Sequence, residues 1–173
     1  STVSSTWFPP YFYYTRQIKD SQWFGIGLFT RFGLGTEFDS DWFGRYNSYK
    51  AEIASVSVNP SWAWKVNEQF SVAVGIEAMY FGIGLKKKIP NPSAQNPFDP
   101  EVAFDSQLEG DSFGWGWNMG FLYKPSDTVN LALTYRSRVE QEVEGDFDVY
   151  LPDGKRFVQK GASGQITLPD LLV

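Results

Sequence analysis

The sequence predicts an all-β protein, an antiparallel meander of strands that forms part of a transmembrane β-barrel. Apolar and polar residues alternate with a period of two over long stretches, as strands with two chemically different faces require. Short polar connections alternate strictly with long ones along the chain. Aromatic residues make up 18% of the 173 residues and charged residues 20%. This combination favours strands with one apolar, lipid-facing side.

The N-terminal part of the chain is the least regular. The segment "TWFPPYFYYTRQ" is aromatic on both faces, and Pro9 and Pro10 cannot donate ladder hydrogen bonds, so interrupted pairing is expected there. Residues 23–33 alternate less cleanly than later runs, because glycines separate their apolar side chains. Glycine inside a strand often marks a bend, a bulge or a close approach, so this strand is expected to be irregular.

The next strands alternate more clearly. Even positions are mostly apolar over residues 54–66 and 70–80, and odd positions are apolar or aromatic over 113–123 and 129–135. A tilted strand needs only about 9–11 residues to cross the hydrocarbon core of a bilayer. The runs therefore have the length that a barrel wall requires.

The connections divide into two kinds. "IKDSQWFGIG", "KVNEQFSVAVG" and "KPSDTVNLAL" contain short turns, whereas residues near 35–49, 86–111 and 145–164 read as long loops. In a meander, this order puts all turns at one end of the sheet and all loops at the other, as in outer-membrane barrels. We therefore expect residues 1–173 to form one partial barrel of about six strands plus the start of another, in the bacterial outer membrane.

Aromatic residues near the strand ends predict two interfacial belts. The belt at the short turns would comprise Trp23, Phe24, Trp62, Trp64 and Tyr123, and the belt at the long loops would contain Trp115 and Trp117.

Composition excludes several function classes. The chain has no cysteine and no histidine, which removes thiol nucleophiles, Ser-His catalysis and His-ligated zinc. A net charge of −5 argues against nucleic acid as a partner. No apolar run approaches the ~18 residues of a spanning helix. No catalytic residue, metal site or cofactor is predicted, and the protein is not expected to be an enzyme.

Two charged sets stand out in the last predicted strand. Glu140, Glu142 and Glu144 share one face, which fits a solvated strand above the membrane or, as a remote alternative, a hydrolase that uses Glu140 and Glu144. Arg136 and Arg138 fall on the polar face and would point into the barrel. They could pair with an interior acid, for which Glu77 is a candidate, or contact an anionic ligand.

The blocks "FGLGTEFDSDWFGRY" and "GWGWNMGFLY…LALTYRS", together with "VNPSWAWKVNEQFSVAVGIEAMY" and the closing "ITLPDLL", resemble the FadL family. These proteins transport long-chain fatty acids and other hydrophobic compounds across the Gram-negative outer membrane. The resemblance covers essentially the whole chain in the same order. It implies a fourteen-stranded barrel with an N-terminal hatch. The hatch and the C-terminal half have no counterpart here, so the chain is expected to be an internal portion that needs the rest of the barrel for closure.

The resemblance also implies a site. The family's third strand is kinked inward to open the wall sideways, and the matching positions are Thr30, Arg31, Phe32 and Gly33. Residues 86–111 correspond to the loop that bears the landing groove, with a short helix expected near residues 99–108. Lys87 is the best match for the basic residue that holds a fatty-acid carboxylate. The full set of expected ligand-binding residues is Lys87, Arg138, Arg136, Phe29, Phe81, Ile89, Phe98 and Phe104.

The expected function is passive uptake of a hydrophobic small molecule, most simply a long-chain fatty acid, with lateral release through the kinked wall. Membrane lipid and lipopolysaccharide are further expected partners, and Lys86, Lys87 and Lys88 could instead contact lipopolysaccharide phosphates. Uptake of aromatic hydrocarbons by the same fold is one alternative. A soluble β-sandwich that binds carbohydrate through Trp62, Trp64, Trp115 and Trp117 is another.

Overall fold

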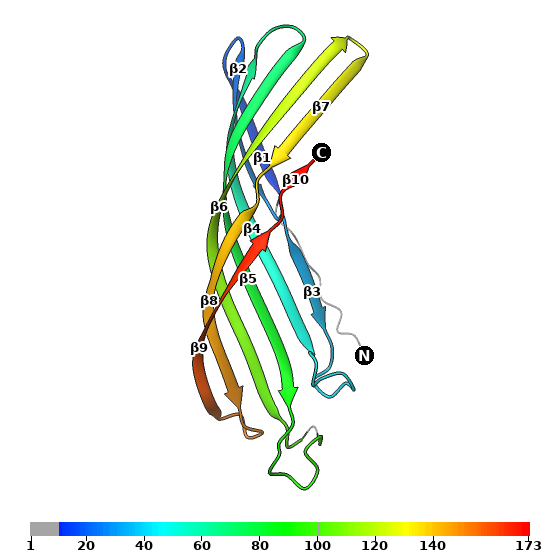
Figure 1. Ribbon diagram of the computed structural model, residues 1–173, viewed down its shortest axis with the longest axis vertical. Helices are drawn as coiled ribbons and strands as arrows, with labels where there is room; N and C mark the ends of the chain where they lie inside the picture. Colours follow the sequence, from blue (N-terminus) through cyan, green and yellow to red (C-terminus); the bar gives the residue numbers. More distant parts are fainter. Residues whose placement is uncertain (1–10, 100) are drawn as a thin grey trace.

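The chain folds into one antiparallel β-sheet (Figure 1). The computed structural model describes residues 11–99 and 101–173, so Pro9 and Pro10 lie outside the described residues. Within this part of the chain, no helix is long and apolar enough to cross a membrane. The strands are β1 (Phe12–Lys19), β2 (Gln22–Phe29), β3 (Gly33–Glu37), β4 (Lys50–Lys65), β5 (Phe70–Ile89), β6 (Phe104–Ser126), β7 (Val129–Arg136), β8 (Val139–Tyr150), β9 (Arg156–Leu168) and β10 (Leu171–Leu172).

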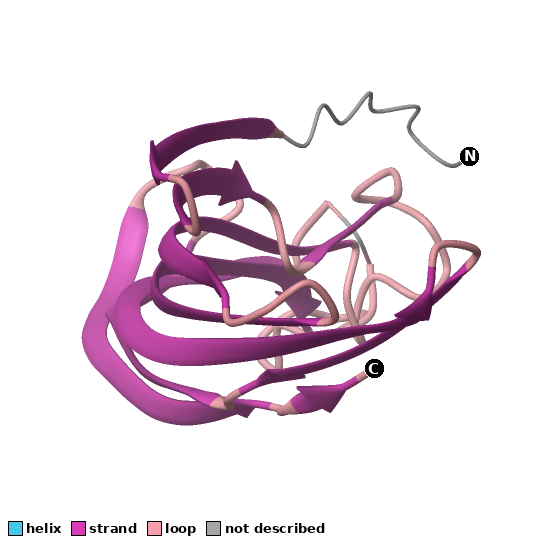
Figure 2. Ribbon diagram, turned by 90° about the horizontal axis from the view of Figure 1, so that it is seen from above, coloured by secondary structure: helices cyan, strands magenta, loops and turns pink. Residues whose placement is uncertain are grey.

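The strands follow one another as a meander. Their order is β1-β2-β4-β5-β6-β7-β10, while β3 pairs with β4, and β8 pairs with β6 and β9. Strands β2 and β3 are two segments of one pass, as are β7 and β8, and β9 and β10, because consecutive segments pair with the same neighbouring pass. Seen from above, the sheet curls into a trough that does not close over the described residues (Figure 2).

Strands extend into two of the segments predicted as long loops, 86–111 and 145–164. Strand β5 has 20 residues and β6 has 23, and they pair without a break from Phe70↔Tyr123 to Ile89↔Phe104. Strands β8 and β9 likewise occupy most of 145–164. The short helix predicted near residues 99–108 is also wrong. A single turn, in which Ala103 N donates to Asp99 O (3.1 Å), leads straight into β6. The connection between β8 and β9 is therefore short, whereas the β3–β4 and β5–β6 connections are long, as predicted.

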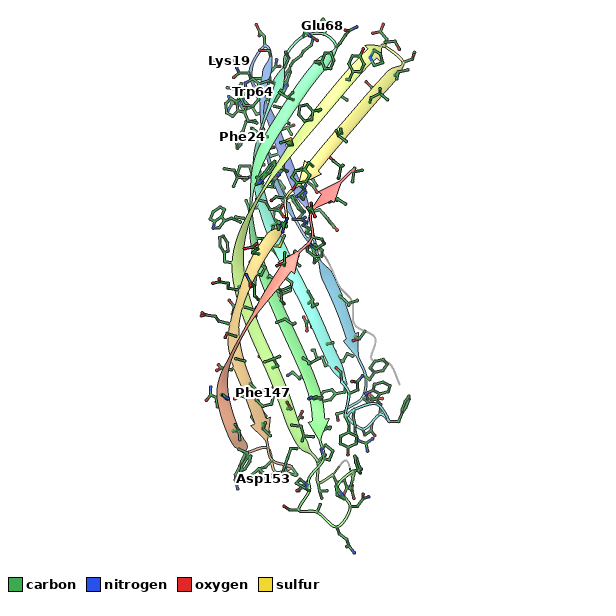
Figure 3. All side chains as sticks on the ribbon, in the orientation of Figure 1. Lys19, Phe24, Trp64, Glu68, Phe147 and Asp153 are labelled. Atoms are coloured by element: carbon green, nitrogen blue, oxygen red, sulfur yellow. The ribbon has the colours of Figure 1, made fainter. Side chains whose placement is uncertain are left out.

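The convex face of the sheet carries the predicted apolar side chains. Val56, Leu131 and Trp117 are 36%, 57% and 46% exposed, and no second layer covers them in the described structure. The side chains at the two ends of this band are aromatic. Phe24 packs edge-on against Trp62, Phe70 stacks on Tyr123 near the short turns, and Phe113 contacts Trp115 toward the other end. Phe24 and Trp64 lie near the end of the sheet that carries Lys19 and Glu68 (Figure 3).

Trp23 does not join that belt. It is paired with Ala63, whereas Phe24 is paired with Trp62, so Trp23 and Phe24 lie on opposite faces of the sheet.

The concave face holds the only extensive core of the described residues. Met79 and Phe81 are 0% and 1% exposed. They pack with Val139, Val143 and Leu168, and with the partly buried Phe32, Ile53, Ile83 and Ile166. Since β8 and β9 contribute to this cluster together with β5, the curvature of the sheet brings its later strands over the middle ones.

Pro60 interrupts a central strand, where proline is normally excluded because it cannot donate to the ladder. The registers Val58↔Ala78 and Ser61↔Gly75 place Pro60 opposite Ile76. The amide Nδ2 of Asn59 donates to the carbonyl oxygen of Ile76 at 2.8 Å. The Asn59 side chain thus supplies the hydrogen bond that the backbone of Pro60 cannot.

Two of the passes that consist of two strand segments carry one extra residue where the segments meet. Phe29 pairs with Ser57 and Gly33 with Ala54, so three residues of one strand oppose two of the other. The Ser55 hydroxyl fills this gap, because it accepts from Phe32 N and donates to Phe32 O, both at 2.8 Å. Such an insertion is a β-bulge, which bends a strand.

The second bulge lies between β7 and β8. Asn118 pairs with Arg136 but Asp111 pairs with Glu144, which leaves one extra residue around Ser137. The Ser137 hydroxyl accepts from Trp117 N at 2.9 Å, and Ser137 N donates to Trp117 O at 2.9 Å. A serine again completes the interrupted ladder.

We expect the Asn59→Ala substitution to lower the free energy of unfolding by about 1–3 kcal/mol, because it leaves the Ile76 carbonyl unpaired. Adding Pro60→Ala should recover most of the loss, since the substituted residue regains a backbone N–H opposite Ile76. Urea unfolding of the full-length protein in lipid vesicles, followed by tryptophan fluorescence, gives the free energy of unfolding of the single and the double variant. If the double variant is no more stable than Asn59→Ala, the role assigned to the Asn59 amide is wrong.

We expect Gly114→Ala to destabilise the sheet by about 1–3 kcal/mol, because a β-carbon there meets Glu140 O and Val139 Cγ1 at 2.7 Å each. Gly120→Ala is the matched control on the same face of β6, where the nearest atom is 3.7 Å away. The same vesicle unfolding assay compares the two. Equal stabilities would show that β8 does not approach β6 this closely.

Candidate functional site

The concave face offers an apolar surface between the loop tips and the middle of the sheet. The core around Met79 and Phe81 continues toward the loops into a cavity of about 160 Å³, lined mainly by Ile83, Leu108, Val143, Ala162 and Ile166. Its walls come from β5, β6, β8 and β9. Such a surface can bury an alkyl or aryl group.

Lys87 is the lysine of its cluster that shares this face. Strand β5 alternates without a break, so Lys87 lies on the side of Phe81, opposite the buried Ser106. Lys86 and Lys88 point to the other side, where their ammonium groups lie 3.5 Å from Glu109 and 3.2 Å from Asp105. Lys87 has no ion-pair partner among residues 11–99 and 101–173.

The loop tips contact one another above this surface. Phe98 is exposed but meets Tyr46 edge-on at 5.5 Å, and Arg45 donates to the Phe98 carbonyl oxygen at 3.1 Å. Ile89 and Phe104 are paired at the ends of β5 and β6. The structure thus places Phe98 on a tip, and Ile89 and Phe104 on strands.

An outward polar cluster supports the base of these tips. Asp105 accepts from the Tyr49 hydroxyl at 2.8 Å and from Lys88 at 3.2 Å. Burial, followed by the hydrogen bond to Asp105, raises the pKa of Tyr49. Tyr49 therefore stays protonated and remains a hydrogen-bond donor over the physiological range.

In the middle of the concave face lies a charged cluster of three residues. The carboxylate of Glu77 is fully buried, and its Oε2 accepts from Arg136 Nη1 at 3.0 Å and from Arg31 Nη1 at 3.4 Å. Arg136 also lies 5.0 Å over the ring of Phe29, which is itself buried. Of the two interpretations open for Arg136, the structure shows pairing with Glu77.

Arg31 reaches across the trough. Its Nη2 donates to the carbonyl oxygens of Ser137 (3.4 Å) and Pro169 (3.0 Å), which lie at the β7–β8 and β9–β10 junctions. The residue sits in the interruption between β2 and β3, within the predicted kink at Thr30, Arg31, Phe32 and Gly33. One guanidinium group therefore joins the interruptions of three passes.

Arg138 does not accompany Arg136. The extra residue at the β7–β8 junction shifts the alternation, so Val139 faces inward with Met79 while Arg138 is exposed on the other side. The prediction that both arginines point into the barrel is therefore wrong for Arg138. The same shift places Glu140, Glu142 and Glu144 outward, as a solvated strand requires.

Sequence reasoning missed Arg31 as a partner of Glu77. The signal available was the buried acid itself, since a carboxylate on the polar face of a strand requires a cation nearby. It also missed Ser55 and Ser137, whose roles follow only from the bulges beside them. Among the described residues, no group of acidic residues is arranged to hold a metal ion.

The tryptophans proposed as a carbohydrate platform do not form one. The ring centroids of Trp62 and Trp64 are 6.1 Å apart. Trp115 contacts Phe113 instead, and Trp117 contacts Tyr135. Both sets lie on the outer face of a curled sheet rather than on a sandwich. The prediction of a partial barrel is confirmed, and the sandwich alternative is wrong.

The sequence matches the family described as "Outer membrane protein transport protein (OMPP1/FadL/TodX)" over residues 2–172. It is 28% identical over 161 residues to a long-chain fatty acid transport protein of Salmonella typhi, covering 87% of this chain and 37% of the relative. It is 32% identical over 136 residues to a 47 kDa outer membrane protein of Pasteurella multocida, covering 74% and 32%.

The fold agrees with solved members of that group. A Pseudomonas aeruginosa FadL homologue superposes with a TM-score of 0.79 at 19% identity, over 91% of this chain and 42% of that one. The Pseudomonas putida toluene transporter TodX gives 0.63 at 20% identity, over 92% and 46%. This chain spans only about a third of the length of the curated relatives. It belongs to the OMPP1/FadL/TodX family of outer-membrane transport proteins, which are transporters and not enzymes.

Proposed function

We propose that this protein takes up long-chain fatty acids across the outer membrane by passive binding. The observation that carries the proposal is Lys87, an inward-facing cation without a partner in the described structure, above an apolar concave surface. Burying alkyl surface there provides about 25 cal/mol per Å². A carboxylate paired with a partly desolvated ammonium group binds more strongly than it would on an open surface.

The residues proposed to contact the ligand differ in position. Lys87, Ile89 and Phe104 lie at the loop end of the trough, and Phe98 lies on a tip beside them. Phe29 and Phe81 lie deeper, at the level of the core. A ligand entering between the tips would pass Phe98 first, then Ile89, Phe104 and Lys87, and then Phe81 and Phe29. Arg138, being outward, is not part of this path.

We also propose that the interruption at Thr30–Phe32 is the place of lateral release. The chain leaves the β2–β4 ladder there and rejoins it at Gly33, and Phe32 packs against the apolar core. An apolar ligand in the core is therefore adjacent to a bent part of the wall. The ligand's transfer into the membrane would then avoid an aqueous passage.

Aromatic hydrocarbons are the second candidate ligand class. The buried rings of Phe29 and Phe81 suit a compact aryl group, and the fold is similar to that of a toluene transporter. The unpaired charge of Lys87 favours the fatty acid. Comparing accumulation of radiolabelled oleate and toluene in cells that carry or lack the full-length gene tests both. If cells with the gene accumulate no more oleate and no more toluene than cells without it, the transport proposal is rejected.

We expect Lys87→Gln to weaken oleate binding by about 1.5 kcal/mol, roughly tenfold, because it removes a charged hydrogen bond to the carboxylate. Lys88→Gln is the matched control, since Lys88 is adjacent in sequence but points outward to Asp105. Isothermal titration of detergent-solubilised protein with oleate gives both affinities. A loss of equal size in the two variants would remove Lys87 from the head-group site.

A further inference from the structure

The concave face changes character at the level of Glu77. Toward the loops it carries the apolar core of Met79, Phe81, Val139, Val143 and Leu168, with the buried polar Ser55, Ser112 and Gln141 beside it. Toward the short turns most positions of the same face are small or polar, namely Asn59, Ser61, Ala63, Ala73, Gly75, Asn118, Gly120, Ala132 and Thr134, with Trp23 and Leu122 as large apolar exceptions. The cluster of Arg31, Glu77 and Arg136 lies at this boundary.

This cluster carries a surplus positive charge. Two guanidinium groups share one carboxylate, which leaves a net charge of +1 on the concave face. Glu77 is fully buried and the Arg31 side chain is 10% exposed, so neither is well solvated. The Arg136 side chain is 28% exposed, and only its Nη1 is committed to Glu77. Arg136 therefore has nitrogen donors to offer on the side of the trough.

Arg31 and Glu77 are held by the fold rather than by each other alone. Arg31 donates to Ser137 O and Pro169 O, and Glu77 projects from a continuous central strand. An alkyl chain that reached this level would meet charged side chains, and displacing either guanidinium group from Glu77 would leave a buried charge uncompensated. The apolar core of this wall therefore ends where the cluster begins.

We infer that Arg31, Glu77 and Arg136 form a charged floor, which stops an apolar ligand at this level and retains a ligand with an anionic head group over an uncharged one. Lys87 contacts the head group near the loops, Arg136 contacts it after the ligand has moved down to this level, and Arg31 and Glu77 position Arg136. The inference rests on the proposed function and adds a specificity element to it. The floor is separate from Lys87, which lies ten residues away along β5, ~33 Å at the rise of a strand.

The test compares two probes that share an alkyl chain, oleate and oleyl alcohol, on the full-length protein. We expect Arg136→Gln to weaken oleate binding at least fivefold and to change oleyl alcohol binding less than twofold. Arg136→Lys keeps the charge and should stay within threefold of the unsubstituted protein for oleate. Heat-dependent gel mobility of each variant confirms that the barrel is assembled.

Other outcomes overturn either the inference or its premise. If Arg136→Gln weakens both probes equally, or neither, the floor does not select for an anionic head group. If Arg136→Lys loses as much oleate affinity as Arg136→Gln, geometry rather than charge decides retention, and the charged-floor inference fails. If the unsubstituted protein binds neither probe, the proposed function itself fails.

Discussion

Every backbone N–H and C=O in the wall of this sheet must have a partner, because the apolar convex face leaves no water to replace a missing hydrogen bond. The long ladders of β4, β5 and β6 meet this requirement directly. Where the ladder is interrupted, a side chain completes it: Asn59 beside Pro60, Ser55 at the first bulge and Ser137 at the second. These inward-facing serine and asparagine side chains therefore complete the backbone hydrogen bonding of the wall.

The same alternation that satisfies the wall also sorts charges between two environments. In the run of three lysines, Lys86 and Lys88 meet acidic partners outside, while Lys87 is left facing the trough. Inside, Glu77 is stabilised only because Arg31 and Arg136 converge on it from distant strands. A buried carboxylate without those cations would be strongly destabilising. Curvature of the sheet is thus necessary for the charge arrangement.

The fold followed from the sequence where the period of two was unbroken. Residues 70–80 and 113–123 show their apolar face plainly, and the turns between such strands are short and polar. The extents of β5, β6, β8 and β9 did not follow, because above the membrane both faces of a strand are polar and look like loop. The inward position of Lys87 follows from its register, whereas Arg138 was misplaced, because a bulge shifts alternation without a marker in composition. The pairing of Arg31 with Glu77 joins residues 46 apart, which no local pattern can reveal.

The single extra residue around Ser137 determines which side chains of β8 face the trough and which face outward. Had β7 continued into β8 without it, Glu140, Glu142 and Glu144 would project into the trough and oppose Lys87 with negative potential. Such a lumen would repel fatty-acid anions and admit cations or neutral solutes. Deleting one residue at this junction would therefore exchange the two faces of β8 without changing any side chain of β8.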